Sequence, residues 1–193
     1  MTSVEDTVSD SVVAINISWQ LLTGVLVFSM QAGFGMLEAG SVRYKNYQSS
    51  LIKNTVIPII CGLAWFMWGY AFSFGAVNSG FIGHRFFAIT KKNDFDELSH
   101  WFYQYVVMCC TVNIISGPVA ERMNLPTFFV FSFFVAAWIY PVIVAWTWGG
   151  GWLAAMGYSD FAGSGIVHLT GGISGLVGAV ILGPRLGKDK KVN

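Results

Sequence analysis

Charged side chains are scarce in this sequence of 193 residues. Asp, Glu, Lys and Arg make up 11% of it, while the AVILMFWYC set makes up 54%; ordinary globular domains carry about 25% charged residues. So little charge cannot cover a soluble surface, where these four residue types dominate. The formal net charge of +1 gives no bulk attraction toward nucleic acid, and no nucleic-acid partner is expected. The composition predicts a protein whose solvent is the lipid bilayer.

Cysteines and catalytic motifs are equally sparse. Cys61, Cys109 and Cys110 fall in apolar stretches, which favours buried thiols over a disulfide framework or a metal site. The sequence has no phosphate loop, no H-E-x-x-H motif and no nucleophile–base pair, so we expect no enzyme, no cofactor and no metal. The first ten residues carry three acids and no Lys or Arg, so no cleaved secretory leader is expected.

Long runs without formal charge separate the few charged residues. Five such windows occur, at 11–37, 54–84, 98–120, 123–159 and 161–184. A helix needs about 20 residues to cross the hydrocarbon, so each window is long enough for one crossing. In the longest window, the aromatic and glycine-rich stretch 146–152 is typical of an interfacial loop. The sequence therefore predicts transmembrane helices at about 15–39, 51–73, 101–118, 126–146 and 162–182.

Basic residues are distributed unevenly among the connections. One side of a five-span arrangement receives eight of the eleven, namely Arg43, Lys45, Lys53, Arg122, Arg185, Lys188, Lys190 and Lys191. Because cytoplasmic loops carry the excess of Lys and Arg, that side is predicted to be cytoplasmic. We expect an extracellular N-terminus over 1–14, one membrane domain over 15–182 and a basic cytoplasmic tail over 183–193. The longest connection, about 74–100, is expected to be a solvated loop.

His168 is a titratable residue well inside the fifth predicted span. At 100° per residue, one side of that helix gathers, within about 60° of His168, Phe161 and the small or polar residues Ser164, Gly165, Gly171, Gly172 and Gly175. Two interpretations remain open. In the first, this stripe of residues is a helix–helix contact with G-x-x-x-G packing, and His168 forms a hydrogen bond with a neighbouring carbonyl group. Alternatively, His168 and Phe161 line a narrow pore, in which an imidazole can accept or donate a proton.

Other polar and aromatic residues stand at or near predicted span ends. Asp160 is expected to cap the fifth helix, and its charge would also favour a cation at an extracellular mouth. Trp148 is either an interfacial tryptophan or a ring whose face binds a cation, and such a cation–π interaction is worth about 0.5–2 kcal/mol. Asn113 lies within the third span. Glu38, near the end of the first, is expected to reach the headgroup region.

Several segments resemble the ammonium transporter (Amt/MEP/Rh) family. They lie in the family's order along nearly the whole chain, at 30–40, 43–46, 68–75, 119–122, 148–151, 160–168, 175–178 and 183–185. The resemblance implies an all-α membrane fold of eleven spans, built from two five-span inverted repeats and a final helix. It further implies trimers with a pore in each subunit. This chain matches the first repeat.

The resemblance also implies roles for individual residues. Trp148 matches the external aromatic that recruits the cation, and Asp160 the carboxylate that supports recruitment and deprotonation. His168 matches one of two pore imidazoles that conduct ammonia or relay a proton. Tyr103 and Val107 depart from the pattern, since they stand at the recruitment and gate positions where the family usually has two phenylalanines.

Three functions are therefore considered for the chain. The first is ammonium transport across the plasma membrane, with a half-pore that is incomplete alone because the second imidazole belongs to the other repeat. The second is a non-conducting module that associates with full-length subunits and modulates them. The third is a packed membrane anchor in which His168 is merely hydrogen-bonded.

Overall fold

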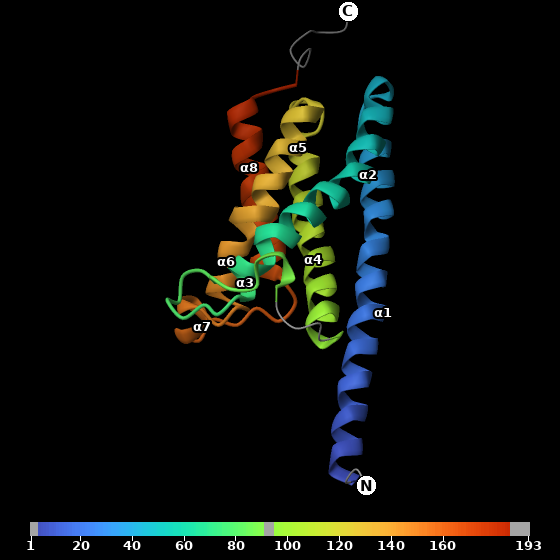
Figure 1. Cartoon of the computed structure of the whole chain (residues 1–193). Helices are drawn as coiled ribbons and strands as arrows, with labels where there is room; N and C mark the ends of the chain where they lie inside the picture. Colours follow the sequence, from blue (N-terminus) through green and yellow to red (C-terminus); the bar gives the residue numbers. More distant parts are fainter. Residues whose placement is uncertain (1–3, 91–94, 186–193) are drawn as a thin grey trace, which may run out of the picture.

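The chain folds into a bundle of membrane-length helices (Figure 1). The computed structural model describes residues 4–90 and 95–185, and these residues contain no β-strand. Five of their helical segments are long and apolar enough to cross a membrane: Val8–Ser41, Tyr44–Phe74, Phe95–Val119, Leu125–Trp146 and Ser164–Leu182. The predicted all-α fold is confirmed, and the longest charge-free window does hold a single crossing.

Two helix starts differ from the prediction. Helix α1 (Val4–Ser41) begins well before residue 15, so most of the predicted N-terminal segment is helical. Helix α4 (Phe95–Val119) begins inside the predicted loop 74–100, with Asp96 and Glu97 in its first turn, where acids complement the helix dipole. Charged residues limit the length of helix that lipid can cover, but they do not end a helix that continues into water.

The second and fourth crossings each contain a widened π-helical turn. The second consists of α2 (Tyr47–Ala64), η2 (Trp65–Gly69) and α3 (Tyr70–Phe74), and the fourth of α5 (Leu125–Phe134), η4 (Val135–Ile139) and α6 (Tyr140–Trp146). A Cβ on Gly69 would lie 2.6 Å from the Ala136 carbonyl oxygen, so the two widened turns pack backbone to backbone. Only glycine permits this approach.

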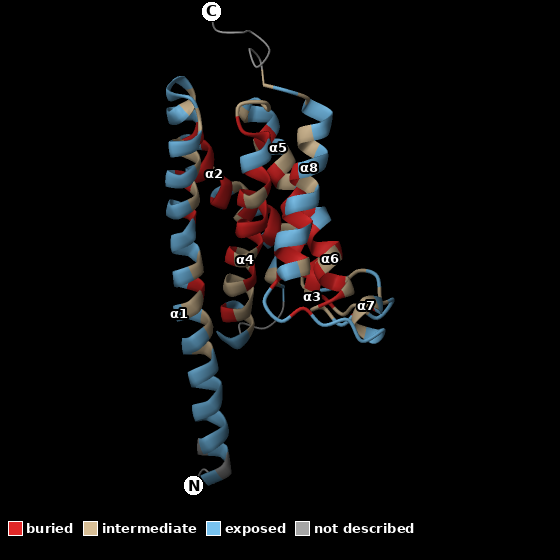
Figure 2. Ribbon diagram, turned by 180° about the vertical axis from the view of Figure 1, so that it is seen from behind, coloured by how far each residue is buried: buried red, intermediate tan, exposed pale blue. Residues whose placement is uncertain are grey.

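Helix α4 is the centre of the bundle. It lies between α1 and α8 (Thr170–Leu182), as the front and rear views both show (Figures 1 and 2). The largest fully buried side chains include Trp65, Tyr70, Tyr140, Phe128 and Ile57. The three cysteines are buried and free, as predicted. The short elements η1 (Tyr44–Asn46), η3 (Phe87–Ile89) and α7 (Trp152–Ala155) lie in the connections.

Polar side chains join α1 to α4 along their length. Three hydrogen bonds do so: Ser99 Oγ to Gln20 Oε1 at 2.9 Å, Asn113 Nδ2 to Gln31 Oε1 at 2.5 Å, and Ser116 Oγ to Glu38 Oε2 at 2.5 Å. Residue numbers rise together along both helices, so the two helices run parallel. Hydrogen bonds of this kind hold helices together in lipid, where apolar contact gives no preference for protein over acyl chain.

Glu121 ties three connections together at one end of the bundle. Its Oε1 accepts hydrogen bonds from the backbone N of Arg43 at 2.9 Å, from Arg43 Nε at 3.0 Å and from Asn46 Nδ2 at 2.6 Å. Its Oε2 forms an ion pair with Arg185 Nη1 at 2.7 Å. Burial opposes ionisation, yet the bonds from Asn46 and Arg43 lower the pKa of Glu121 to about 2. We call Arg43, Asn46, Glu121 and Arg185 the Glu121 junction.

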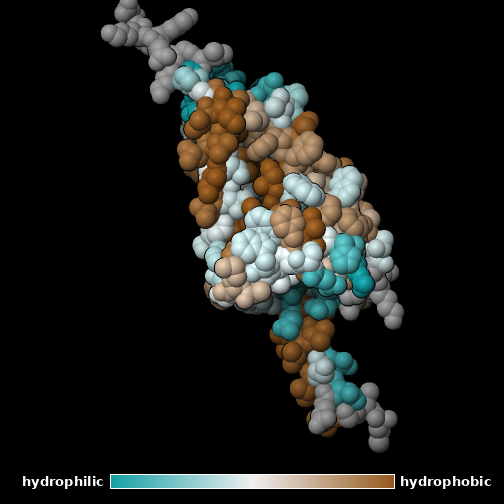
Figure 3. All heavy atoms as spheres, turned by 90° about the vertical axis from the view of Figure 1, so that its left-hand side faces the viewer, coloured by the Kyte–Doolittle hydropathy of each residue, from teal (hydrophilic) through white to brown (hydrophobic). Residues whose placement is uncertain are grey.

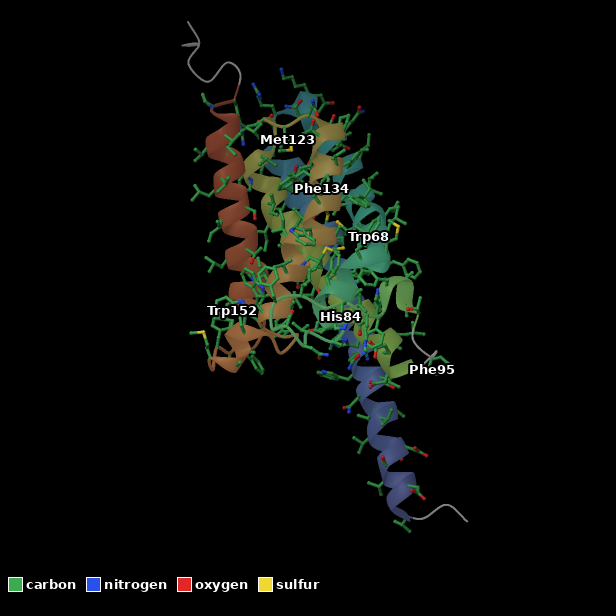
Figure 4. The ribbon with its side chains drawn as sticks, turned by 60° about the vertical axis from the view of Figure 1, so that its left-hand side comes forward. Trp68, His84, Phe95, Met123, Phe134 and Trp152 are labelled. Atoms are coloured by element: carbon green, nitrogen blue, oxygen red, sulfur yellow. The ribbon has the colours of Figure 1, made fainter. Side chains whose placement is uncertain are left out.

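The junction confirms that the connections rich in basic residues share one end of the molecule. Met123 marks that end in Figure 4, while His84, Phe95 and Trp152 lie toward the opposite end of the bundle. Glu121 holds a left-handed backbone angle, φ 60°, which costs a non-glycine residue about 1 kcal/mol and is sustained here by the bonds of its side chain. Of the predicted basic tail, residues 186–193 lie outside the described residues.

Candidate functional site: one face of the α4–α8 pair

The Asp160 carboxylate caps the start of the fifth crossing by accepting hydrogen bonds from backbone N–H groups of that helix. Its Oδ1 accepts from the backbone N of Gly163 at 2.8 Å and of Ser164 at 3.0 Å, and its Oδ2 from those of Gly165 and Ile166, both at 2.8 Å. These donors are the unpaired N–H groups of a helix start, so the predicted cap is confirmed. Burial opposes ionisation, but these backbone bonds lower the pKa of the Asp160 carboxyl below its usual range.

The Asp160 carboxylate is fully occupied by these contacts. A carboxylate has about four lone-pair sites, and Ser164 Oγ, at 3.4 Å from Oδ1, adds a fifth donor to the four backbone groups. The side chain is also buried in the protein, with 8% of the residue exposed. Asp160 therefore offers no open position for a direct ligand, and its charge acts on its surroundings through its field and through the backbone that it positions.

Trp148 is held against the same turn. Its indole Nε1 donates to the backbone oxygen of Asp160 at 2.7 Å. A Cβ on Gly163, whose φ is +90°, would lie 3.5 Å from the Trp148 ring, so the ring packs closely on the start of the fifth crossing. The indole is half-buried and fixed in orientation by this bond. The structure thus brings together two of the residues selected from the sequence, Trp148 and Asp160.

His168 lies in a third widened turn, η5 (Ser164–Leu169). Its Nδ1 is 3.2 Å from the carbonyl oxygen of Gly163, which also accepts from the backbone N of Val167 and of His168 itself. A carbonyl oxygen can only accept, so a hydrogen bond here requires the proton on Nδ1, and in that tautomer Nε2 is the acceptor. The ring is exposed. Its hydrogen bond runs to its own helix and not to a neighbouring one.

The single stripe predicted around His168 is wrong, because the structure divides it in two. Gly171 and Gly175 pack on α4, where added Cβ atoms would lie 2.8 Å from Ile114 Cγ2 and 2.9 Å from Pro118 Cγ. His168 and Gly172 are exposed instead. The π-helical turn breaks the regular 100° step on which the prediction relied. Helix contact and histidine are therefore separate features of this crossing.

Phe161, Tyr103 and Val107 occupy different surroundings. Phe161 is fully exposed, directly after Asp160. Tyr103 and Val107 are half-buried residues one turn apart on α4, and Val107 packs against the hydrophobic core. Ile114, two turns beyond Val107, is the residue that meets Gly171 of α8. Val107 and Ile114 therefore belong to the side of α4 that borders α8.

The sequence interpretation missed a buried charge pair. Glu38 does not reach outward to headgroups: its Oε1 accepts from Lys53 Nζ, and the two side chains are only 10% and 9% exposed. Asn54 Nδ2 donates to Oε2 at 3.3 Å. The sequence did carry a signal for this pair. Glu38 and Lys53 have opposite charges and stand on either side of the short α1–α2 connection, and consecutive helices usually pack against each other.

Comparison with known proteins identifies the family. The model of the Ammonium Transporter Family matches residues 18–193. Ammonium transporter 1 member 3 of Solanum lycopersicum is 40% identical over 97% of this chain and 42% of its own length. Ammonium transporter Amt2 of Archaeoglobus fulgidus is 40% identical over 90% of this chain and 40% of its own length.

Solved structures agree with the sequence comparison. The structure named Sensor Amt Protein superposes with a TM-score of 0.87 and 33% identity, over 91% of this chain and 46% of that one. Candida albicans Mep2 gives a TM-score of 0.80 and 31% identity, over 88% of this chain and 39% of that one. The chain spans about two fifths of the length of these curated relatives. It belongs to the ammonium transporter family and matches the N-terminal half of full-length members.

Proposed function

We propose that the chain contributes one wall of a pore that moves ammonium or ammonia across the plasma membrane. The observation that carries this proposal is the exposed His168 ring, with Nε2 free to accept, on a crossing whose other exposed side chains are largely apolar. Ionisable residues within membrane spans are costly and usually face a cavity or a bundle interior. Figure 3, which shows the side that carries α8, has hydrophobic side chains gathered along this helix.

The outer end of the proposed path is built around Trp148 and Asp160, with Tyr103 and Val107 on α4. An indole face attracts a cation through its quadrupole, and the negative charge of Asp160 also attracts a cation to this end of the path. Tyr103 can supply a second aromatic face, whereas Val107 has no π-face. Phe161, which is fully exposed, is proposed to contact the half of the pore that this chain does not supply.

Desolvation then selects the permeating species. A bare cation in a dry, apolar conduit is too costly, so ammonium must release or relay a proton before ammonia proceeds. His168 Nε2 is the acceptor placed to receive that proton, since Nδ1 is committed to Gly163. We propose further that the complete assembly is a homotrimer with extracellular N-termini and cytoplasmic C-termini, in keeping with the family resemblance and the distribution of basic residues.

The test replaces this histidine in proteoliposomes. The chain is purified from membranes with any subunit that accompanies it, and ammonium flux is measured against potassium flux. His168→Ala should lower ammonium flux at least tenfold or reduce its preference over potassium. His84→Ala, in the exposed loop before η3, is the matched histidine control and should change neither. Unchanged flux and selectivity in His168→Ala would overturn the proposed path.

A second candidate is a non-conducting module that docks on full-length subunits. It is favoured by the wide apolar surfaces of α1 and α8, where Leu22, Val25, Val180 and Ile181 are each more than half exposed. Stable co-purification with a full-length family member, together with no flux from the chain alone, would favour this module. Ammonium flux from liposomes that contain only this chain would exclude it.

A further inference from the structure

His100 is a half-buried histidine that the proposed path does not use. It lies in the second turn of α4, at the end of the bundle where Figure 4 labels Phe95. The Phe74 ring meets its imidazole edge-on, with the ring centres 4.7 Å apart, and the Tyr70 ring does so at 5.8 Å. Both aromatic residues belong to α3, so His100 joins the start of the third crossing to the outer end of the second.

His100 shares a side of α4 with the proposed path. At 100° per residue, residues seven positions apart differ by only about 20°, so His100, Val107 and Ile114 form one row along the helix. Ile114 is the residue that meets Gly171 of α8. His100 is the outermost member of the row, about 10 Å beyond Val107, and Tyr103 is one turn away. A change of charge at His100 therefore acts on the approach to the proposed mouth.

Tyr70 determines which nitrogen of this ring carries the proton. Its hydroxyl donates to Glu97 Oε1 at 2.5 Å and lies 3.0 Å from His100 Nδ1. A hydroxyl has one proton, so once that proton is given to the carboxylate the oxygen can only accept from Nδ1. This arrangement requires the Nδ1–H tautomer when the ring is neutral, and it leaves Nε2 as an acceptor.

Gln104 faces the other nitrogen of the ring. Its amide nitrogen lies 3.5 Å from His100 Nε2, while its Oε1 is buried and accepts no hydrogen bond from the described residues. Protonation of the ring would place an N–H group against the amide N–H₂ group. A half-turn of the amide exchanges its two ends, so that Oε1 accepts from the charged ring and gains the partner that it lacks. The same side chains therefore serve both charge states of His100.

The other titratable groups that face His100 within the described chain are two acids and a phenol. Asp96 and Glu97, in the first turn of α4, are the charged groups whose fields reach the imidazole. Tyr70 is the titratable group that the second crossing contributes. An imidazole ordinarily changes its charge between pH 5 and 8, where neighbouring acids favour the charged form and burial favours the neutral form.

We propose that His100 is a proton-operated switch at the outer mouth, and that the mouth attracts ammonium less strongly when this ring is charged. In the neutral state, Nδ1 donates to Tyr70 and Nε2 is unprotonated. A proton from the outer water binds Nε2, the Gln104 amide turns, and one positive charge is added beside the approach to Tyr103. Loss of that proton to water restores the first arrangement. The effect on ammonium rests on the proposed transport function, whereas the two arrangements of the ring do not.

Nitrogen-15 NMR of the histidine rings tests the switch, because the chain has only three histidines. The resonances that are missing from His100→Gln identify this ring in the purified, histidine-labelled protein. They should report the Nδ1–H tautomer at high pH and titrate between pH 4 and 8. An Nε2–H tautomer at high pH, or no titration in that range, overturns the switch.

Gln104→Leu tests the second arrangement of the cluster. The substitution removes the acceptor of the charged ring, so the titration midpoint of His100 should fall by about half a pH unit or more. His84→Gln, in the exposed loop before η3, is the control and should leave the midpoint unchanged. A midpoint that Gln104→Leu does not move would show that the amide only packs against the ring, and it overturns the switch.

Ammonium flux in the proteoliposomes used for His168 tests the consequence for the mouth. Flux is measured one pH unit above and one below the midpoint, at the same subsaturating ammonium concentration. The ratio of the two fluxes should be at least threefold larger in the wild type than in His100→Gln, which has no charge at either pH. His84→Gln should keep the wild-type ratio. Where His100→Gln does not fold, Gln104→Leu replaces it, and the pH at which flux falls should move with the midpoint.

The outcomes separate the switch from the transport function. Equal flux ratios in the wild type and His100→Gln overturn the effect on the mouth and leave the transport function intact. Absence of ammonium flux in the wild-type protein overturns the transport function together with that effect, and the NMR titration then decides whether the ring has two arrangements.

Discussion

Helices α1 and α4 are joined by hydrogen bonds, yet their surroundings are opposite. In the most apolar stretch of the first crossing only 6% of residues are buried by the rest of the described chain, against 61% in that of the third. The less hydrophobic helix is the buried one. Figure 2 shows the contrast, with exposed residues along α1 and buried ones along α4. In a membrane protein, the most apolar residues cover the surface that faces lipid, and polar side chains are buried between the helices.

A substitution in the Glu121 junction, at the ends of these helices, should have the largest effect on stability. Glu121→Gln is expected to lower the free energy of unfolding by about 2 kcal/mol, because hydrogen bonds to a charged group are lost. The folded pKa of about 2 lies below the ordinary value of 4.5, so the stabilisation is complete above pH 4.5 and declines as pH falls toward 2. Thermal unfolding in detergent across that range measures both.

The pH profile supplies its own control. Wild-type stability should fall between pH 4.5 and 2 by more than that of Glu121→Gln, because the variant has no carboxylate at this position. Parallel profiles for the two proteins would mean that the junction does not stabilise the α1–α2 and α4–α5 connections.

The contact between α8 and α4 is tested by two adjacent glycines. Gly171→Ala is expected to cost about 1–2 kcal/mol, because its Cβ would lie 2.8 Å from Ile114 Cγ2 in a closely packed contact. Gly172→Ala has no heavy atom within 4 Å of its new Cβ and should stabilise the helix by up to about 1 kcal/mol. Equal effects in denaturant unfolding would show that the α4–α8 packing described above is wrong.

The polar contacts between α1 and α4 should give the smallest effect. A double-mutant cycle of Gln31→Leu and Asn113→Leu should show a coupling energy of about 0.6 kcal/mol, typical of hydrogen bonds between membrane helices. Thermal unfolding of the four proteins measures it. The pair Leu22→Ala and Asn113→Leu should be additive, because the apolar Leu22 side chain is 58% exposed and forms no hydrogen bond with Asn113. Coupling in that control as large as in the first cycle would contradict a specific α1–α4 bond.

Much of this architecture could be predicted from the sequence. Charge-free windows locate the five crossings because the energy of a charge in hydrocarbon is large and independent of the details of packing. The cap at Asp160 is local, and local chemistry suffices to place it. The basic residues Arg43 and Arg185 do meet at one end, because connections that alternate between the two ends must meet there.

Other features depend on packing that the sequence pattern does not carry. The π-helical turn at Ser164–Leu169 shifts the helix phase, so a regular projection placed His168 and Gly171 on one side. The Glu38–Lys53 contact needs the angle between α1 and α2, which local periodicity does not specify. The start of α1 at Val4 lies outside the charge-free window, because the acids before residue 11 limit the stretch that lipid can cover but do not end the helix.

The bond from the His168 ring to Gly163 gives the imidazole a fixed polarity, with one nitrogen tethered and the other outward. Gly163 is also the residue whose backbone N donates to Asp160 Oδ1 at 2.8 Å, so the carboxylate and the ring are anchored to the two sides of one residue. A change in the backbone conformation of this residue would therefore move the cap and the imidazole together.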